Sequence, residues 1–425
     1  MPNKPLAALT AVFFALAPLA ARAADIGSVL PVARDAYGFL HRNPELGKAE
    51  TKAHDYLTGQ LRGFGGFTFV ASKNAPTAVI AVFDTGRPGP TIALRAEMDA
   101  RRLDPGATEP ASHSPRSEID GVMHNCGHDV HAAILLATAK YVATHKARYA
   151  GKIVFLFQPA EEVAGGADDI VAEGVLDKLG VKKLYALHSA PGMPVGAIAV
   201  SPGATLAGSN YFTLKLTGRG SHAAAPHDGD DLPVVAADFV EALARLPARQ
   251  LDIANRPVVI SVTKVVAESG GPNILPASAE LSGTIRAFEP LTVAPEGGEE
   301  IETIIRRTID GLAAAHGVRA EWSLRVGSPA TVNDPSLYAD TLPALQAAWP
   351  GRIDTRPSRG MFSEDFAYYT ADRPAFYVSL GVAKGGLGEG GVHTADFTIH
   401  PDALEAGVRL MTTLAEIGTT GKAER

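Results

Sequence analysis

Four short and nearly continuous apolar runs constrain the fold of this chain more than any other feature of its sequence. The runs are four or five residues long and begin at Thr91, Ile153, Leu184 and Phe376. Such runs are typical of strands that are buried on both faces of a mainly parallel sheet. Between the first two runs, residues 130–141 place apolar side chains at helical spacing. Strands that alternate with helices predict an α/β fold with a mainly parallel sheet.

The middle of the chain follows a different order of elements. Apolar spacing predicts strand, helix, two strands, helix and strand, at residues 211–217, 232–246, 258–266, 279–288, 294–316 and 320–326. This β-α-β-β-α-β order is typical of two helices that pack on an antiparallel sheet. We therefore predict an α+β domain at residues 209–327, inserted between the two parts of a catalytic domain at residues 24–208 and 328–425.

The first residues have the features of a secretory signal peptide. Lys4 precedes an apolar stretch at residues 6–20, and the small-residue motif Ala21-Arg-Ala23 follows it. A membrane anchor is the alternative, but the stretch is shorter than the ~20 residues that span a bilayer, and Pro18 interrupts it. We therefore expect residues 1–23 to be removed, and the mature chain to be soluble, free of the membrane, and periplasmic or secreted.

Composition argues against two classes of protein. The chain has 39 Lys and Arg residues against 46 Asp and Glu residues, a net charge of −7 without a basic run, which argues against nucleic acid as a partner. Its one cysteine, Cys126, cannot form a disulfide within the chain, so no disulfide framework holds the fold together. A lone thiol in an oxidising compartment is open to damage unless it is buried or bound to a metal.

Groups that can bind metal ions follow the predicted strands. A cysteine and a histidine flank a glycine before the helix at 130–141, two glutamates follow the second run, and histidines follow the third and fourth; these residues are Cys126, His128, Glu161, Glu162, His188 and His393. The carboxyl ends of parallel strands meet at one edge of a sheet, where α/β proteins bind ligands. Thiolate, imidazole and carboxylate are typical ligands of zinc or a similar divalent ion. Four separate segments thus predict one metal site.

The two adjacent glutamates predict chemistry as well as metal binding. Alternation at a strand end separates the directions of Glu161 and Glu162, so one can bind metal while the other faces the substrate. A carboxylate beside a metal-activated water is suited to take its proton. For any one of these residues alone, a structural histidine or a solvated carboxylate is the more common role. The convergence of the whole set favours the metal site.

Nine motifs, in the same order along almost the whole mature chain, resemble those of the dinuclear metal amidohydrolases related to aminoacylase and carboxypeptidase. The resemblance is to the branch of hippurate hydrolases and indoleacetyl-amino acid hydrolases. The motifs are His41-Arg-Asn-Pro-Glu-Leu-Gly47, Met123-His-Asn-Cys-Gly-His-Asp129, Gln158-Pro-Ala-Glu-Glu162, Ala186-Leu-His-Ser-Ala-Pro191, Gly218-Arg-Gly-Ser-His-Ala-Ala-Ala-Pro226, Asn273-Ile-Leu-Pro276, Gly283-Thr-Ile-Arg286, Ser363-Glu-Asp-Phe366 and His393-Thr-Ala-Asp396.

The resemblance implies a site with two divalent metal ions as cofactors, zinc or manganese or another such ion. It implies that Glu161 is the general base and that the metal ligands are Cys126, His128, Glu162, His188 and His393. It also implies a catalytic α/β domain with an inserted lid domain, which agrees with the domain division predicted from the order of elements.

The resemblance also implies roles for residues of the lid. In relatives the lid mediates dimerisation, so a homodimer or higher homo-oligomer is expected. His222 would stabilise the oxyanion, in some relatives within the partner's active site, and Asn273 and Arg286 would contact the substrate or its carboxylate. From the residues alone, His222 would be structural and Arg286 a surface ion pair. A guanidinium can nevertheless hold a carboxylate in a bidentate fork.

Other residues of the motifs are expected to support the site without binding metal. Asp99 and Asp129 would orient metal ligands, together with His124 and His131. The pair Glu364-Asp365 would support the rim of the site. Second-layer carboxylates and histidines of this kind fix the direction of the ligands they touch.

Two departures from the family pattern lie beside the expected pocket. Glu97 stands where the family usually has Asp, and Arg101-Arg102 stands where it usually has Leu-Pro. The loop that follows, residues 103–120, is polar and rich in proline and lacks the usual pattern. An unusual substrate preference is therefore expected.

The predicted function is metal-dependent hydrolysis of the amide bond of a small-molecule substrate, an N-acyl amino acid or a related amide. The first alternative is a metallo-carboxypeptidase or dipeptidase that acts on short peptides with the same metals. The second is a solute-binding protein on a bilobal α/β frame. A base beside the metal ligands favours an enzyme over the solute-binding protein.

Overall fold

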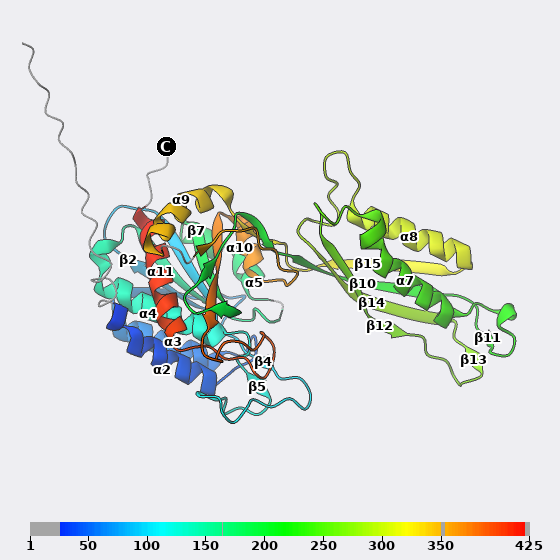
Figure 1. Cartoon of the computed structure of the whole chain (residues 1–425), viewed down its shortest axis with the longest axis horizontal. Helices are drawn as coiled ribbons and strands as arrows, with labels where there is room; N and C mark the ends of the chain where they lie inside the picture. Colours follow the sequence, from blue (N-terminus) through cyan, green and yellow to red (C-terminus); the bar gives the residue numbers. More distant parts are fainter. Residues whose placement is uncertain (1–25, 164, 350–352, 421–425) are drawn as a thin grey trace, which may run out of the picture.

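The computed structural model describes residues 26–163, 165–349 and 353–420, and it has two units (Figure 1). The larger unit is an eight-stranded sheet with helices on both faces, and the smaller unit is a four-stranded sheet with two helices. The predicted α/β fold with an inserted α+β domain is confirmed. The predicted signal peptide, residues 1–23, lies outside the described residues.

The four apolar runs form the centre of the large sheet. Its strand order is β1-β2-β6-β3-β7-β18-β8-β17, and β6, β3, β7 and β18 are parallel neighbours. The strands are β1 (Phe67–Val70), β2 (Val79–Asp84), β3 (Thr91–Glu97), β6 (Lys152–Gln158), β7 (Val181–Pro194), β8 (Ile198–Ala199), β17 (Ile353–Asp354) and β18 (Ala375–Ala383). Pairs β1–β2, β2–β6 and β8–β18 are antiparallel, so the sheet is parallel at its centre and mixed toward its edges.

A separate apolar core fills each face of the large sheet, which explains why its central strands are apolar on both sides. One face carries α2 (Leu30–Arg42), α3 (Thr51–Phe64), α4 (His128–Thr144), α9 (Pro335–Ala348) and α11 (Asp402–Thr420). The other face carries α5 (Ala167–Ala172), α6 (Val175–Lys178) and α10 (Phe366–Asp372). None of the helices within the described ranges is long and apolar enough to cross a membrane.

The inserted unit has the predicted β-α-β-β-α-β order and its own apolar core. Its elements are β10 (Gly208–Thr217), α7 (Leu232–Gln250), β12 (Val258–Val266), β14 (Ser278–Ala287), α8 (Ile301–His316) and β15 (Arg319–Val326). The sheet order is β12-β14-β10-β15, and every neighbouring pair is antiparallel. A small two-stranded sheet of β11 (Ser221–His222) and β13 (Ile274–Leu275) lies at the end of this unit that is remote from the large sheet (Figure 1).

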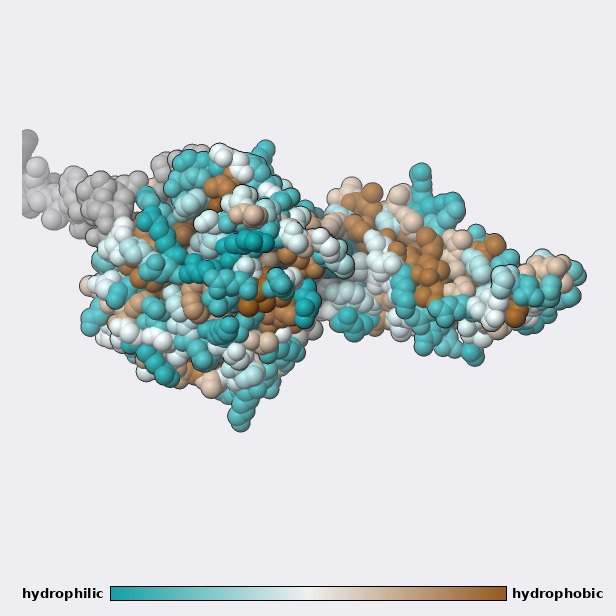
Figure 2. Space-filling model, turned by 90° about the horizontal axis from the view of Figure 1, so that it is seen from below, coloured by the Kyte–Doolittle hydropathy of each residue, from teal (hydrophilic) through white to brown (hydrophobic). Residues whose placement is uncertain are grey.

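The chain passes between the two units where β10 begins and where β15 ends, at Gly208 and Val326. Beside these crossings, β9 (Gly203–Leu206) pairs with β16 (Thr331–Asn333) on the side of the large unit. The backbones are close there, because a Cβ on Gly327 would lie 2.5 Å from Ser209 Oγ. In Figure 2 the large unit is the broad body, and the inserted unit is the narrower arm that extends from it.

One tight turn sets the position of two predicted ligands. Gly127 precedes α4 with a φ of 93°, a left-handed conformation that favours glycine. A Cβ at this position would lie 2.4 Å from Ser189 Oγ, so a side chain has no room. Cys126 and His128 lie on either side of this turn and are both buried.

Candidate metal centre

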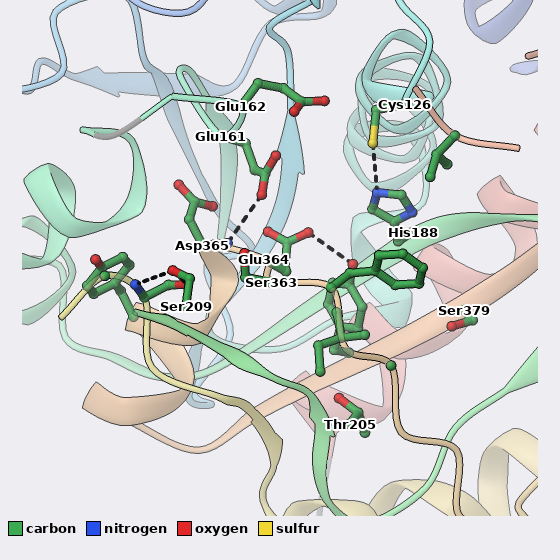
Figure 3. A pocket seen from close by; sticks show the side chains of 18 of the residues that line it. Cys126, Glu161, Glu162, His188, Thr205, Ser209, Ser363, Glu364, Asp365 and Ser379 are labelled. Carbon is green, nitrogen blue, oxygen red and sulfur yellow. Dashed lines mark hydrogen bonds between the residues drawn. The ribbon is translucent and has the colours of Figure 1, made fainter. Parts of the chain in front are cut away.

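The structure brings six predicted residues together at the carboxyl end of the parallel strands. Cys126 and His128 come from the start of α4, Glu161 and Glu162 follow β6, and His188 lies in β7. His393 comes from the loop after β18. Figure 3 shows the side chains of Cys126, His188, Glu161 and Glu162 around one pocket.

The donor atoms of these residues form three overlapping triplets. Within each triplet, all donor atoms lie within 4.8 Å of one another; the triplets are Cys126, His128 and His188; Cys126, Glu162 and His393; and His128, Glu161 and Glu162. The shortest contacts are 3.2 Å between His393 Nε2 and Glu162 Oε1, and 3.5 Å between Cys126 Sγ and His188 Nε2. Shared members link the triplets, which is the arrangement that two neighbouring ions with a common ligand require.

The chemistry of this set fits divalent metal ions. His128 Nε2 is buried and has no hydrogen-bond partner among the described residues, which is costly for a polar atom that binds nothing. Burial lowers the pKa of His188 to about 3, with His131 adding to the effect, so the ring is in its neutral, metal-binding form. Burial raises the pKa of the Cys126 thiol, and a bound cation is what makes a buried thiol a thiolate.

Asp99 fixes the direction of two of these residues. Nδ1 of His128 lies 3.0 Å from the Asp99 carbonyl oxygen and 3.2 Å from Asp99 Oδ1. The other carboxylate oxygen, Oδ2, accepts a hydrogen bond of 2.9 Å from the Glu162 backbone N–H. These are the contacts expected of a residue that orients ligands, and Asp99 itself belongs to none of the donor triplets.

Asp129 lies one step further from the donor atoms. Its carboxylate lies 2.7 Å from His41 Nδ1, and His41 Nε2 lies 3.0 Å from Glu109 Oε1. Burial would lower the pKa of His41, but the hydrogen bonds to Asp129 and Glu109 outweigh it and raise that pKa to about 9. Sequence reasoning missed Glu109, because the loop that contains it lacks the family pattern.

A buried charge network lies beneath the glutamates. Arg95, in β3, is fully buried and forms ion pairs with Glu97, with Glu364 Oε1 at 2.9 Å and with Asp365 Oδ1 at 2.6 Å. Glu97 also lies 2.8 Å from His131 through its second oxygen. Sequence reasoning missed Arg95, although an arginine inside a buried apolar run must have charged partners, and this requirement could have identified it.

Glu161 lies between this network and the donor atoms. Its Oε2 lies 3.9 Å from His128 Nε2, and its Oε1 accepts a hydrogen bond of 3.3 Å from the Asp365 backbone N–H. Burial, followed by the neighbouring carboxylates of Glu364 and Asp365, raises the pKa of Glu161 well above its usual range. A carboxyl group with a raised pKa can hold a proton and release it again.

A pocket of about 990 Å³ lies between the two units, and its walls include Cys126, Glu161, Glu162, His188 and His393. The large unit contributes the donor set and the segment 358–365, and the inserted unit contributes Ser209, Tyr211 and Arg325 among others. Figure 3 shows Ser209 and Thr205 across the pocket from the donor set. A pocket of this size can take a substrate of several dozen atoms at the boundary between two units.

The predicted lid residues lie in two places. Arg286 Nη1 donates a hydrogen bond of 2.5 Å to Ser363 Oγ, so its side chain reaches the border of the pocket. His222 and Asn273 are exposed at the small β11–β13 sheet, where the Ala223 N–H donates a 2.9 Å hydrogen bond to the Asn273 carbonyl. The structure does not bring these two residues to the pocket of their own chain (Figure 1).

Comparison with known proteins identifies the family. The profile of peptidase family M20/M25/M40 matches residues 93–417. The chain is 31% identical to the N-acetylcysteine deacetylase of Bacillus subtilis, over 89% of this chain and 94% of the relative. It is 32% identical to the IAA-amino acid hydrolase ILR1-like 2 of Arabidopsis thaliana, over 88% and 82%. It is 31% identical to thermostable carboxypeptidase 2 of Saccharolobus solfataricus, over 87% and 90%.

A solved structure supports the same assignment at the level of fold and site. The crystal structure of a dinuclear metal-binding peptidase of the M20 family from Bacillus subtilis superimposes with a TM-score of 0.76. The two chains are 28% identical, and the match covers 93% of this chain and 98% of the other. The chain therefore belongs to peptidase family M20/M25/M40, as its motifs predicted, and it is a metal-dependent amidohydrolase of that family.

Proposed function

We propose that this protein hydrolyses the amide bond of N-acyl amino acids. The observation that carries the proposal is the position of Glu161, whose carboxylate lies beside the donor set and faces the same pocket. Relatives named as an N-acetylcysteine deacetylase and an IAA-amino acid hydrolase cleave bonds of this type. They are hydrolases, which favours an enzyme over a solute-binding protein.

In this proposal two divalent ions, zinc or manganese, are held by Cys126, His128, Glu162, His188 and His393. Bound ions of this kind polarise a carbonyl group and lower the pKa of water. The thiolate and imidazole donors favour zinc, and the carboxylate accepts either metal.

Glu161 acts on protons in the proposed reaction. Its carboxylate takes a proton from the attacking water and then gives it to the leaving amine, so one side chain acts first as base and then as acid. The position of Glu161, 3.9 Å from His128 Nε2 and facing the pocket, supports this role. Arg286, beside Ser363, is proposed to bind the α-carboxylate of the substrate.

A second copy of the chain is proposed to complete the site through the lid. His222 is exposed on the β11–β13 sheet, remote from the pocket of its own chain, so its proposed contact with the oxyanion needs a partner subunit. Several large apolar side chains are exposed on the lid, as expected of an interface: Tyr211, Val234, Ile253, Val259, Val265, Ile274, Val293 and Val326. Figure 2 shows apolar patches along the narrow arm.

Cleavage of short peptides as a carboxypeptidase or dipeptidase is the second candidate. The relative named as a thermostable carboxypeptidase favours it, and the same donor set would serve. The two candidates differ in the group on the carbonyl side of the amide bond, because one is a simple acyl group and the other is an amino acid with a free amine.

A substrate panel combined with metal analysis tests the proposal. The purified protein should contain two divalent ions per chain and should hydrolyse N-acetyl, benzoyl and indoleacetyl amino acids faster than the matching dipeptides. Faster cleavage of dipeptides would favour the second candidate. Turnover of neither class would contradict the proposed function.

The role of Glu161 has its own test. The Glu161→Gln variant should keep its metal and lose activity by about a thousandfold or more, because the amide cannot accept the proton. Metal content by elemental analysis and turnover of an N-acetyl amino acid measure the two effects separately. Near-normal turnover in this variant would show that another group is the base.

We also propose that the mature protein is exported. The charged start, the apolar stretch and the Ala21-Arg-Ala23 motif support this location. Sequencing the N-terminus of the protein from its native host should find that the mature chain begins at Ala24.

A further inference from the structure

Three arginines gather where the lid joins the catalytic domain. The guanidinium carbon of Arg325 lies 4.3 Å from the centre of the Tyr211 ring, and that of Arg286 lies 6.0 Å from the same centre. The guanidinium carbon of Arg359 lies 5.3 Å from the centre of the Phe288 ring. An aromatic ring beside a guanidinium limits its motion and leaves its N–H edge free to bind an anion.

Two of these arginines belong to the substrate pocket. Arg325 and Arg359 line the same pocket as the metal donors, and both are exposed. Across residues 26–163, 165–349 and 353–420, neither forms an ion pair with a carboxylate. Asp168 also lines the pocket and forms no ion pair with either of them.

The charges of the pocket are divided between its two ends. The carboxylates of Glu161, Glu162, Glu364 and Asp365 lie at the end with the metal donors. The arginines lie at the end where the lid meets the catalytic domain: Arg325 is near the end of β15, and Arg359, in the catalytic domain, contacts the Phe288 ring of the lid. Like charges without counter-ions repel one another, so the cationic end favours a ligand that brings negative charge with it.

The amount of positive charge exceeds what one α-carboxylate needs. Arg286 is proposed to bind the α-carboxylate, which leaves Arg325 and Arg359 without an anion. Tyr211 and the exposed ring of Phe362 also line the pocket and offer apolar surface to a short methylene chain. A carboxylate on such a chain suits this combination of two guanidinium groups and aromatic rings.

We infer that the preferred substrate is an N-acyl amino acid that carries a second carboxylate, which Arg325 and Arg359 bind. This inference rests on the proposed function and adds the substrate class. The second carboxylate lies either on the side chain of the amino acid or at the end of a dicarboxylic acyl group, and the test below separates these two sources.

Pairs of substrates that differ only in charge test the inference. N-acetyl-L-glutamate is compared with N-acetyl-L-glutamine, and N-succinyl-L-alanine is compared with N-succinamoyl-L-alanine. At least one charged member should have a kcat/KM about tenfold higher than its neutral partner, because solvent weakens ion pairs with exposed guanidinium groups. A preference in the first pair places the carboxylate on the amino acid, and a preference in the second places it on the acyl group.

Variants connect the preference to the two arginines. In the Arg325→Gln/Arg359→Gln double variant, the ratio of kcat/KM within the preferred pair should fall close to one. Arg319→Gln is the matched control, because Arg319 lies on the same strand, pairs with Glu321 and does not line the pocket. It should keep the wild-type ratio.

A binding measurement makes the test independent of turnover. Calorimetry with the Glu161→Gln variant should show tighter binding of the charged member of the pair, and the Arg325→Gln/Arg359→Gln changes should remove this difference. A ratio near one in the wild-type protein, or a ratio that the double variant leaves unchanged, overturns the inference while hydrolysis itself still supports the proposed function. Absence of hydrolysis for every N-acyl amino acid overturns the proposed function instead.

Discussion

At the scale of single residues, Arg101 distinguishes this metal centre from those of the amidohydrolases that it resembles. Its Nε lies 3.5 Å from Glu162 Oε2, and its Nη1 is buried without a hydrogen-bond partner in the described part of the chain. A guanidinium at this distance attracts the same carboxylate that a metal ion needs. The two cations therefore compete for Glu162.

Replacing Arg101 should strengthen metal binding. We expect Arg101→Leu to lower the dissociation constant of the more weakly held ion by about threefold to tenfold, since the side chain is partly exposed and the ion pair is worth ~1 kcal/mol. Competition with a fluorescent chelator measures the constant. Arg102→Leu is the control, because Arg102 is the exposed neighbour. Weaker metal binding in Arg101→Leu would mean that Arg101 orients Glu162 instead of competing for it.

His41 makes stability depend on pH in a defined range. Its pKa is about 9 in the folded chain, against an ordinary value of 6.5, because Asp129 and Glu109 stabilise the charged ring. A raised pKa stabilises the fold below pH 6.5, and this stabilisation, about 3 kcal/mol, is lost as the pH rises through 9. Urea unfolding at several pH values should show this loss, and His41→Gln should reduce the slope. His227→Gln, at an exposed position, should retain it.

The residues that sequence reasoning identified and those that it missed differ in one respect. Predicted ligands such as Cys126 and His188 could be found because several residues that can bind metal stand at the ends of elements that the sequence identifies, and their convergence favours a metal site. The roles of Arg95 and Glu109, in contrast, are recognised only from the partners that the structure shows. Glu364 and Asp365 lie 269 and 270 residues from Arg95 along the chain, and no local pattern reports a pairing over that distance.

At the scale of elements, the turn before α4 holds the metal centre together. Gly127 has a left-handed backbone, and a Cβ there would collide with Ser189 Oγ at 2.4 Å and contact the Phe397 ring tightly at 3.1 Å. An alanine at this position must move the start of α4 or the Ser189 side of β7. Either movement separates Cys126 and His128 from His188.

The Gly127→Ala variant should therefore lose metal while it keeps most of its fold. We expect metal content to fall from two ions per chain to one or none, with a loss of stability of about 1–3 kcal/mol from the strained backbone. Elemental analysis and circular dichroism measure the two effects. Gly311→Ala is the matched control, because Gly311 lies in α8, where a Cβ would meet no atom within 4 Å. A fully metallated Gly127→Ala protein would contradict the proposed role of the turn.

The central elements could be predicted from the sequence, and the edges of the large sheet could not. The strands β3, β6, β7 and β18 are apolar on both faces, so their runs are continuous and easily recognised. The edge strand β1 is half-buried or exposed along its length, and β8 and β17 have two residues each. The pairing and direction of short, partly polar strands depend on the neighbouring strands. The periodicity of a sequence gives no information about which strands these are.

At the scale of the whole molecule, the proposed role of His222 requires a second chain. The donor set and the arginines share one pocket, whereas His222 lies at the far end of the lid (Figure 1). The order of elements could predict the inserted lid, because order is a property of one sequence. The proposed contact of His222 with a second copy could come only from the resemblance, because it depends on the shape of an assembly.

Hybrid dimers test whether His222 acts across a subunit boundary. Glu161→Gln and His222→Asn should each be nearly inactive as homodimers, since every site then lacks either its base or its oxyanion donor. Differently tagged copies of the two variants, expressed together and purified through both tags, yield dimers with one variant of each kind. In a two-fold dimer with exchanged histidines, one site then combines Glu161 of one subunit with His222 of the other, so about half of the wild-type activity should return.

The matched control combines two variants whose altered residues both lie in the pocket of their own subunit, so exchange between subunits cannot restore a complete site. In the hybrid of Glu161→Gln with Cys126→Ser, each subunit carries a defect in its own pocket. The hybrid therefore has no complete site and should stay inactive. Sedimentation must show a dimer in both preparations. If the Glu161→Gln/His222→Asn hybrid is also inactive, His222 serves the pocket of its own chain, and the lid must then swing toward that pocket by the full length of the arm that separates them.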